Sequence, residues 1–330
     1  MRQTLLLIAF AAALTAQPRV TSVGQAADFT GPLAPGTLAT LFGSALATAT
    51  AGAEQVPLPT TLGGTTVRVN GQPVPLTFVS PTQVNFQLPA RIATGSASLT
   101  VTVGTATSAA TNFTVAATAP GIFQYGANRG VVQNQDYSLN ADSNLAKRGE
   151  VLTVYLTGIG ITQPVVPEGT VAPSSPLARP QVNAQAYLGG SPARILFLGL
   201  TPGAIGLAQA NIEVPALLAS GNYPLVLEVG GVSSRPVRVS VEGRPDGTLP
   251  EGLRCFSGSV ESVTRSLEKE FAGQPDEIEL GSIKLCPTCS QRQPINVVFT
   301  RFFEKARASK LLVDACYDDT GNISLLRMRR

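Results

Sequence analysis

Four cysteines are the residues best suited to chemistry, and all of them lie beyond residue 250: Cys255, Cys286, Cys289 and Cys316. Four cysteines in a small exported domain are typical of two structural disulfides, for which three pairings exist. A Cys255–Cys316 bridge would close a loop of about 60 residues. In the chain-entropy description such a bridge contributes ~4 kcal/mol to stability. The cysteines are therefore expected to be disulfide cysteines.

The same four thiols admit two other interpretations. A Cys₄ zinc site needs no imidazole, but only Cys286-Pro-Thr-Cys289 has the spacing of a zinc knuckle, while Cys255 and Cys316 are isolated. A redox CxxC usually lies at the start of a helix, where the thiol pKa is lowered. Here Pro294 closely follows the motif and discourages a helix. Zinc binding and thiol-redox activity are therefore kept as alternatives to disulfides.

The chain contains no His and no Trp. Without His, a Ser-His-Asp or Cys-His catalytic constellation is impossible, as is any zinc site built on imidazole. We therefore predict no catalytic residue, no cofactor and no metal site outside the zinc alternative. The expected class is a protein that is not an enzyme, and this expectation is weakest for the domain that carries the cysteines.

The N-terminus has the layout of a secretory signal peptide. Arg2 precedes an apolar run over 5–14, and small residues follow up to Ala16. The run is too short to cross a bilayer, which takes about 20 residues. We expect a protein that is secreted or periplasmic, with no membrane span.

Charge separates the chain into two unlike parts near residue 245. Residues 246–330 contain 12 basic and 12 acidic residues, whereas residues 1–245 contain 12 and 9. The stretch between them is rich in Gly and Pro, as linkers often are. The net charge of +3 is not gathered in one stretch, so nucleic acid is not an expected partner.

An internal repeat occupies the weakly charged part. Gln83-Val-Asn-Phe-Gln-Leu-Pro89 matches Gln209-Ala-Asn-Ile-Glu-Val-Pro215, and Leu99-Thr-Val-Thr-Val-Gly104 matches Leu225-Val-Leu-Glu-Val-Gly230 at the same offset. Each copy consists of short alternating strands. Asn70-Gly71 and Gly189-Gly190 occupy equivalent places and predict type I′ hairpin turns. This pattern is typical of an immunoglobulin-type β-sandwich, formed twice in tandem.

A polar stretch between the copies offers oxygen ligands at Asp136, Asn140, Asp142 and Asn144. It lacks the spacing of an EF-hand, because Ala141 and Lys147 occupy the places of the required Gly and the bidentate acid. A polar turn around Asp136-Tyr137 is expected rather than a calcium site.

Several motifs occur in the order of one known family. They are Ala34-Pro-Gly-Thr-Leu-Ala-Thr-Leu-Phe-Gly43, the run ending at Pro89, Ala119-Pro-Gly-Ile-Phe123, Gln133-Asn-Gln-Asp136 and Arg148-Gly-Glu-Val-Leu-Thr-Val. Over residues 20–242 the chain resembles a secreted C-terminal module of soil bacteria whose two halves are similar to IPT/TIG-type immunoglobulin-like domains. The resemblance implies an extracellular pair of β-sandwiches without assigned catalytic residues. It does not cover residues 246–330, where any distinct activity is therefore expected.

These observations predict an all-β chain of two tandem immunoglobulin-like β-sandwiches and a small β-rich or α+β domain that contains the cysteines. The expected function is a secreted, non-enzymatic binding or structural module that engages protein or polysaccharide. The expected boundaries are a signal peptide over 1–16, sandwiches over 17–118 and 119–243, a linker over 244–252 and the small domain over 253–330.

Overall fold

The computed structural model describes residues 17–126, 128–216, 218, 220–242, 254–258, 312–317 and 323–329. The chain divides into two compact units, Met1–Pro245 and Asp246–Arg330. All regular secondary structure in the described residues is β. Within those residues, no helix has the length and hydropathy that a membrane crossing requires. The predicted signal peptide lies outside the described residues.

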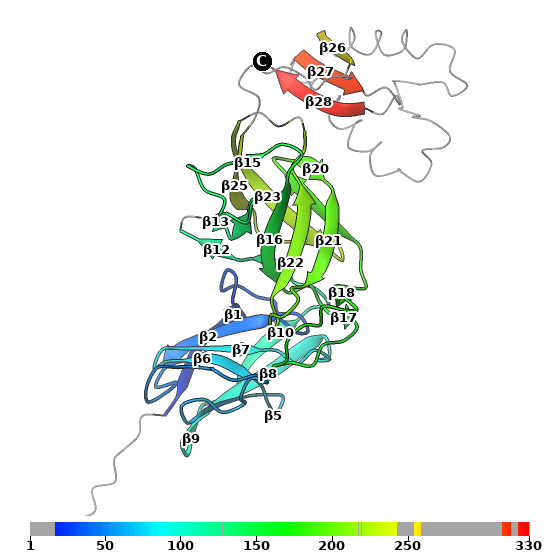
Figure 1. Ribbon diagram of the computed structural model, residues 1–330. Helices are drawn as coiled ribbons and strands as arrows, with labels where there is room; N and C mark the ends of the chain where they lie inside the picture. Colours follow the sequence, from blue (N-terminus) through cyan, green and yellow to red (C-terminus); the bar gives the residue numbers. More distant parts are fainter. Residues whose placement is uncertain are drawn as a thin grey trace, which may run out of the picture. The chain divides into compact units, whose positions relative to one another are not determined.

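The first half of the larger unit, residues 17–118, contains two antiparallel sheets (Figure 1). One sheet has the order β1-β2-β7-β6-β3, and the other has the order β10-β8-β4-β5 with β9 beside β8. The strands are β1 (Arg19–Gln25), β2 (Leu38–Ser44), β3 (Ala51–Gly52), β4 (Thr65–Val69), β5 (Gln72–Pro73), β6 (Leu76–Val79), β7 (Gln83–Gln87), β8 (Gly95–Val103), β9 (Ala106–Thr107) and β10 (Thr111–Val115).

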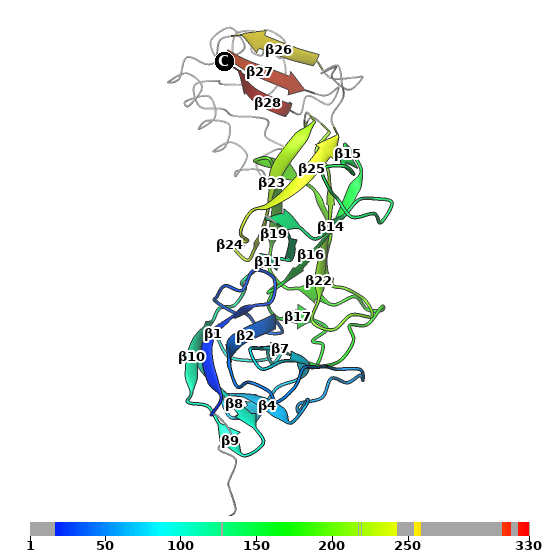
Figure 2. The same cartoon turned by 90° about the vertical axis from the view of Figure 1, so that its left-hand side faces the viewer.

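The second half, residues 119–242, also contains two large sheets, coloured green to yellow in Figure 2. Their orders are β11-β16-β22-β21, with β14 beside β16, and β12-β13-β25-β23-β19-β20, with β15 beside β25 and β24 beside β23; β17 and β18 form a separate pair. The strands are β11 (Gly121–Ile122), β12 (Gln124–Tyr125), β13 (Arg129–Gly130), β14 (Val132–Gln133), β15 (Ala146–Lys147), β16 (Val151–Thr157), β17 (Thr162–Gln163), β18 (Arg179–Pro180), β19 (Ala184–Leu188), β20 (Ser191–Ala193), β21 (Ile195–Leu200), β22 (Ala208–Glu213), β23 (Gly221–Val229), β24 (Val232–Ser233) and β25 (Val237–Glu242).

The sequence repeat is also a structural repeat. The order β2-β7-β6 of the first half recurs as β16-β22-β21, and β10-β8-β4-β5 recurs as β25-β23-β19-β20. Even an irregularity recurs: the register shifts between Leu76 and Phe78 in β6, and between Ile195 and Phe197 in β21. The two copies therefore share strand order and a bulge as well as sequence.

Each half has its own core, because alternate strand residues point inward. In β8 the buried positions include Leu99 and Val101, and in β23 they include Leu225 and Leu227, which are their repeat counterparts. Phe86 is fully buried in the first core, where much of the remaining volume is filled by Leu and Val. The period-2 pattern of the sequence therefore correctly predicts which face of these strands is buried.

The predicted hairpin turns are confirmed. Asn70 and Gly71 have φ values of 48° and 82°, and they connect the paired residues Val69 and Gln72. Gly189 and Gly190, with φ values of 62° and 80°, connect Leu188 to Ser191 in the same way. Two successive positive φ angles are what a type I′ turn requires.

The smaller unit is described through one antiparallel sheet of order β26-β27-β28. Its strands are β26 (Arg254–Gly258), β27 (Leu312–Tyr317) and β28 (Ile323–Arg329). Cys255 lies in β26 and Cys316 in β27, whereas Cys286 and Cys289 lie outside the described residues.

Candidate functional site

The two halves of the larger unit meet in a contact that we call the junction. The second half contributes residues 157–170, the end of β16 and the segment that contains β17. The first half contributes the residues at the start of β2 and the end of β7. The N–H of Leu38, the first residue of β2, donates to Oγ1 of Thr157, the last residue of β16, at 3.0 Å. Thr157 is buried. The junction is thus joined by hydrogen bonds as well as by packing.

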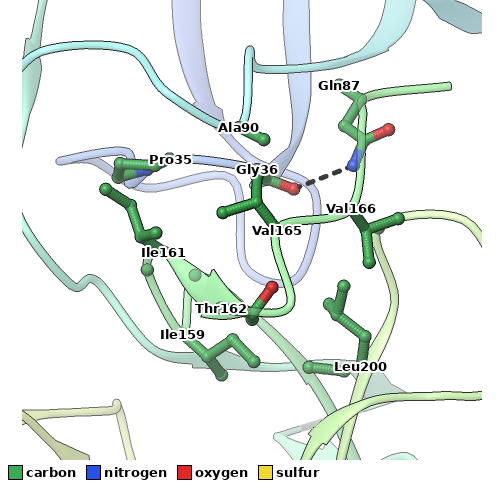
Figure 3. A pocket seen from close by; sticks show the side chains of 14 residues that line it. Pro35, Gly36, Gln87, Ala90, Ile159, Ile161, Thr162, Val165, Val166 and Leu200 are labelled. Carbon is green, nitrogen blue, oxygen red and sulfur yellow. Dashed lines mark hydrogen bonds between the residues drawn. The ribbon is translucent and has the colours of Figure 1, made fainter. Parts of the chain in front are cut away.

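Gln87 at the end of β7 joins both halves at the centre of the junction. Its Oε1 accepts a hydrogen bond from the Gly169 N–H at 2.8 Å. Its Nε2 donates to the Gly36 carbonyl at 3.2 Å, the bond drawn in Figure 3. The Gly169 carbonyl in turn accepts from the Leu58 N–H at 2.8 Å. Gln87 is only 4% exposed, so these bonds are shielded from water. A buried side-chain amide therefore holds the segment after β17 against the first half.

Gly158 shows how closely the chains approach at the junction. Its φ is +78°, and a Cβ atom placed there would lie 1.9 Å from the Ala119 carbonyl oxygen. Both the left-handed backbone and the lack of space require glycine at this position. The turn that follows β16 is therefore pressed directly against the chain that connects the halves.

A small cavity of about 20 Å³ lies inside the junction, between residues such as Gly36, Gln87, Ile159, Val165 and Leu200 (Figure 3). A cavity needs about 10–15 Å³ to hold one water molecule. The space therefore suits a single water molecule, and it is too small for an organic ligand.

A larger open groove of about 470 Å³ lies next to the junction, within the range of about 300–1,000 Å³ that is usual for ligand sites. Both halves line it: the β4–β5 hairpin and the residues after β7 on one side, and the segment after β17 on the other. The lining residues are Val69, Asn70, Gln72, Pro89, Ala90, Arg91, Ile92, Ala93, Val165, Pro167 and Glu168.

Two charged side chains belong to this groove. Glu168 is half-buried, and its Oε2 accepts a hydrogen bond from the Ala90 N–H at 3.2 Å, which ties the two walls together. Arg91 is exposed. The apolar members of the wall include Pro89, Ile92 and Val165. The groove therefore presents one cation, one carboxylate and an aliphatic surface.

The polar stretch between the repeat copies forms a hydrogen-bonded turn. The Tyr137 N–H donates to the Asn134 carbonyl at 2.9 Å, and the Asn134 N–H donates to the Ser138 carbonyl at 2.8 Å. The turn therefore spans residues 135–137, which include the predicted Asp136-Tyr137. Hydrogen bonds from the Ser138 hydroxyl and the Ser138 backbone hold the pKa of Asp136 below its usual value. The Asn144 side-chain amide donates to Ser138 Oγ at 2.7 Å. The polar groups of this stretch therefore bond to one another.

Asn140 connects this turn to β25. Its side chain is 1% exposed, its Oδ1 accepts from the Ser240 N–H at 2.8 Å and its Nδ2 donates to the Ser240 carbonyl at 2.8 Å. Nδ2 also donates to Asn134 Oδ1 at 2.9 Å. Side-chain oxygens of Asp136, Asn140 and Asp142 are thus engaged by protein donors. Nowhere in the described residues do three or more His, Cys, Asp or Glu side chains gather as a metal would require.

A buried arginine completes the same cluster. Arg129 is 5% exposed, and its guanidinium donates to Ser240 Oγ at 2.9 Å and to the Asp142 carboxylate. Arg238 also donates to Asp142, at 3.3 Å. The hydrogen bond from Arg129 is the main reason why the pKa of Asp142 lies below its usual value. This cluster neutralises a buried charge and has a structural role.

The sequence pointed to the cysteines and did not point to the groove, because the groove residues come from three separate stretches of chain. The two motifs that reach the groove, Asn70-Gly71 and the run ending at Pro89, predict strands and turns rather than a binding site. One signal was available. The repeat offset grows from 113 at Gly36/Gly149 to 119 at Pro73/Pro192, so the second copy carries extra residues there. The segment that lines the groove, residues 165–168, lies in the stretch between these two pairs, to which the extra residues belong.

Comparison with known proteins identifies the first half. Residues 18–115 match the IPT/TIG domain family. No curated protein matches the chain in sequence. The first half is an IPT/TIG-like, immunoglobulin-like module.

Among solved structures, the extracellular region of plexin A4 is similar over 68% of this chain and 18% of its own, at 13% identity and a TM-score of 0.21. The I9–I11 tandem of titin is similar over 68% of this chain and 65% of its own, at 9% identity and a TM-score of 0.18. The tandem immunoglobulin repeats of Dlar are similar over 69% of this chain and 95% of their own, at 13% identity and a TM-score of 0.18. The chain thus spans less than a fifth of the plexin structures that it matches.

Proposed function

We propose that this protein is an exported, non-enzymatic binding module built from two tandem immunoglobulin-like sandwiches over 17–118 and 119–243, with a linker over 244–252 and a small cysteine-containing domain over 253–330. IPT/TIG domains are generally non-catalytic and commonly mediate protein interactions. The shared strand order and the shared bulge of the two halves support a second sandwich of the same kind. The expected export rests on the signal-peptide pattern of residues 1–16.

The groove beside the junction is the proposed binding site, and it is the observation that carries the proposal. Its volume of about 470 Å³ is adequate for several side chains, and its walls come from both halves. The hydrogen bond between Glu168 and the Ala90 N–H fixes the distance between those walls. A pre-formed site loses little conformational entropy on binding. The two halves together therefore offer a surface that neither offers alone.

The proposed occupant is an extended segment of a protein partner with an acidic side chain that pairs with Arg91. Aliphatic walls with polar groups at the edge are typical of protein interfaces. Among the groove residues that the structure describes there is no aromatic side chain on which a sugar ring could stack. Protein is therefore favoured over polysaccharide as the partner.

Selection from a phage-displayed random peptide library on the immobilised full chain tests this proposal. We expect enriched peptides that carry Asp or Glu, and at least a tenfold weaker Kd for Arg91→Glu by calorimetry with the synthetic peptide. The matched control is Arg19→Glu, which makes the same charge change at an exposed position of β1 and should leave the Kd unchanged.

Two results would contradict the proposal. One is peptide binding that is equal in the parent protein and in Arg91→Glu. The other is binding on a glycan array that Arg91→Glu abolishes, since that result would make a saccharide the occupant of the groove.

A further inference from the structure

The smaller unit places two of the four cysteines opposite each other. β26 pairs antiparallel with β27, and the register joins Arg254 to Tyr317, Cys255 to Cys316 and Phe256 to Ala315. Directly opposed residues of an antiparallel pair have Cα atoms about 4.5 or 5.5 Å apart. Disulfides span Cα separations of about 4.4–6.8 Å. Either kind of opposed pair therefore meets the distance that a disulfide needs.

We infer that Cys255 and Cys316 form a cross-strand disulfide. Four cysteines allow three pairings, and the strand register selects the one in which these two are partners. Cys286 and Cys289 are then left as each other's only possible partner within the chain. The inference concerns the smaller unit and is independent of the groove proposed above.

The position of the bond in the sheet explains what it would do. Among the strands that the structure describes in this sheet, β26 lies at one edge with β27 as its neighbour, in the order β26-β27-β28. The chain between Cys255 and Cys316 is about 60 residues long, so closing this loop has a large entropic cost. A covalent bond between the two strands removes that cost from the folding step and holds the edge strand in register.

The bond forms by thiol–disulfide exchange with an oxidant that carries an exchangeable disulfide. The Cys255 and Cys316 thiols lose two protons and two electrons and form one S–S bond, and the oxidant's disulfide is reduced to two thiols. This consumes two of the four thiolates that a Cys₄ zinc site would need. The zinc alternative and the disulfide therefore exclude each other.

Peptide mapping of the full chain, exported and purified without reductant, tests the inference. After alkylation of free thiols under denaturing conditions, trypsin places Cys255 in peptide 255–265, Cys316 in peptide 311–327, and Cys286 with Cys289 in peptide 285–292. We expect 255–265 linked to 311–327. A link from 285–292 to either of the other peptides would overturn the inference, as would four alkylated thiols with one zinc ion per chain.

Two single variants make the test robust to poor folding. Cys255→Ser should expose one new alkylated thiol, in peptide 311–327, and leave peptide 285–292 as it is in the parent protein. Cys289→Ser should change peptide 285–292 alone and preserve the 255–316 link. A new alkylated thiol in peptide 285–292 of Cys255→Ser would mean that Cys255 pairs with Cys286 or Cys289, and would overturn the inference. If Cys255→Ser accumulates poorly, Cys289→Ser still tests the 255–316 link.

Discussion

Replacing Gln87 by Ala should weaken the junction more than any other single loss of polar contact there. The change removes the hydrogen bonds to the Gly169 N–H and the Gly36 carbonyl, at 2.8 and 3.2 Å. A buried hydrogen bond contributes about 1 kcal/mol net, and a donor left without a full partner costs about 1–3 kcal/mol. The adjacent cavity of about 20 Å³ would admit water after truncation, so the lower end of that penalty applies. We expect a loss of about 3 kcal/mol, which is roughly a hundredfold change in the unfolding equilibrium.

Two measurements on the full chain check this value. Urea unfolding followed by circular dichroism reports the free energy of unfolding, and hydrogen exchange of the Gly169 amide reports whether the junction opens locally. The control is Gln209→Ala, because the Gln209 amide is half-buried and, among the described residues, its side-chain bond is to the side chain of Asn211, at 3.2 Å. If Gln87→Ala destabilises the chain no more than the control, and the Gly169 amide exchanges at the parent rate, the reasoning about the junction is wrong.

Three further predictions concern the larger unit. Gly158→Ala should lower Tm clearly more than Gly190→Ala: both glycines have φ near +80°, but a Cβ atom meets a carbonyl oxygen only at Gly158, so equal Tm values would contradict the close approach. Asn140→Ala should lower the free energy of unfolding in urea by about 3 kcal/mol, because three side-chain hydrogen bonds of a buried amide are lost. Asn144→Ala, at a partly exposed position, should lower it less. Equal losses for the two variants would argue against a buried Asn140 bridge to Ser240. Asp142 has a lowered pKa in the folded state, so its contribution is present above the unfolded pKa near 3.9 and is lost as pH falls through the folded value. Asp142→Asn should therefore flatten the acid side of the stability profile, and an unchanged profile would refute that role.

Much of the larger unit was predictable from local pattern. Strand alternation identified the buried faces because side chains in a strand point to opposite sides in turn. The turn at Asn70-Gly71 was predictable because few residue types tolerate two successive positive φ angles. The repeat was visible because equivalent strands kept their spacing over about 20 residues. These are all properties of short stretches of chain.

The junction and the groove were not predictable in this way, because their parts are far apart in the chain. Gln87 meets Gly169, and Ala90 meets Glu168, across about 80 residues. Gln87 stands in the repeated run Gln83-Val-Asn-Phe-Gln-Leu-Pro89, but nothing in that run marks it as a contact between the halves. The roles of all four residues arise only when the two halves pack together. Likewise, the sequence left three pairings of four cysteines open, and only the strand register sets Cys255 against Cys316.

Two residues at the same place in the repeat show where the sequence alone stops. The repeat pattern of the sequence places Gln87 and Glu213 at equivalent positions, and each is the last residue of its strand, β7 or β22. Only the tertiary structure decided that Gln87 is buried and joins the two halves, whereas Glu213 forms an ion pair with the exposed Arg194. The physical reason is that periodicity depends on the local backbone, which the two copies share. Whether the side chain at the strand end is buried, and which residue it contacts, depends on what packs against that end, and there the two copies differ.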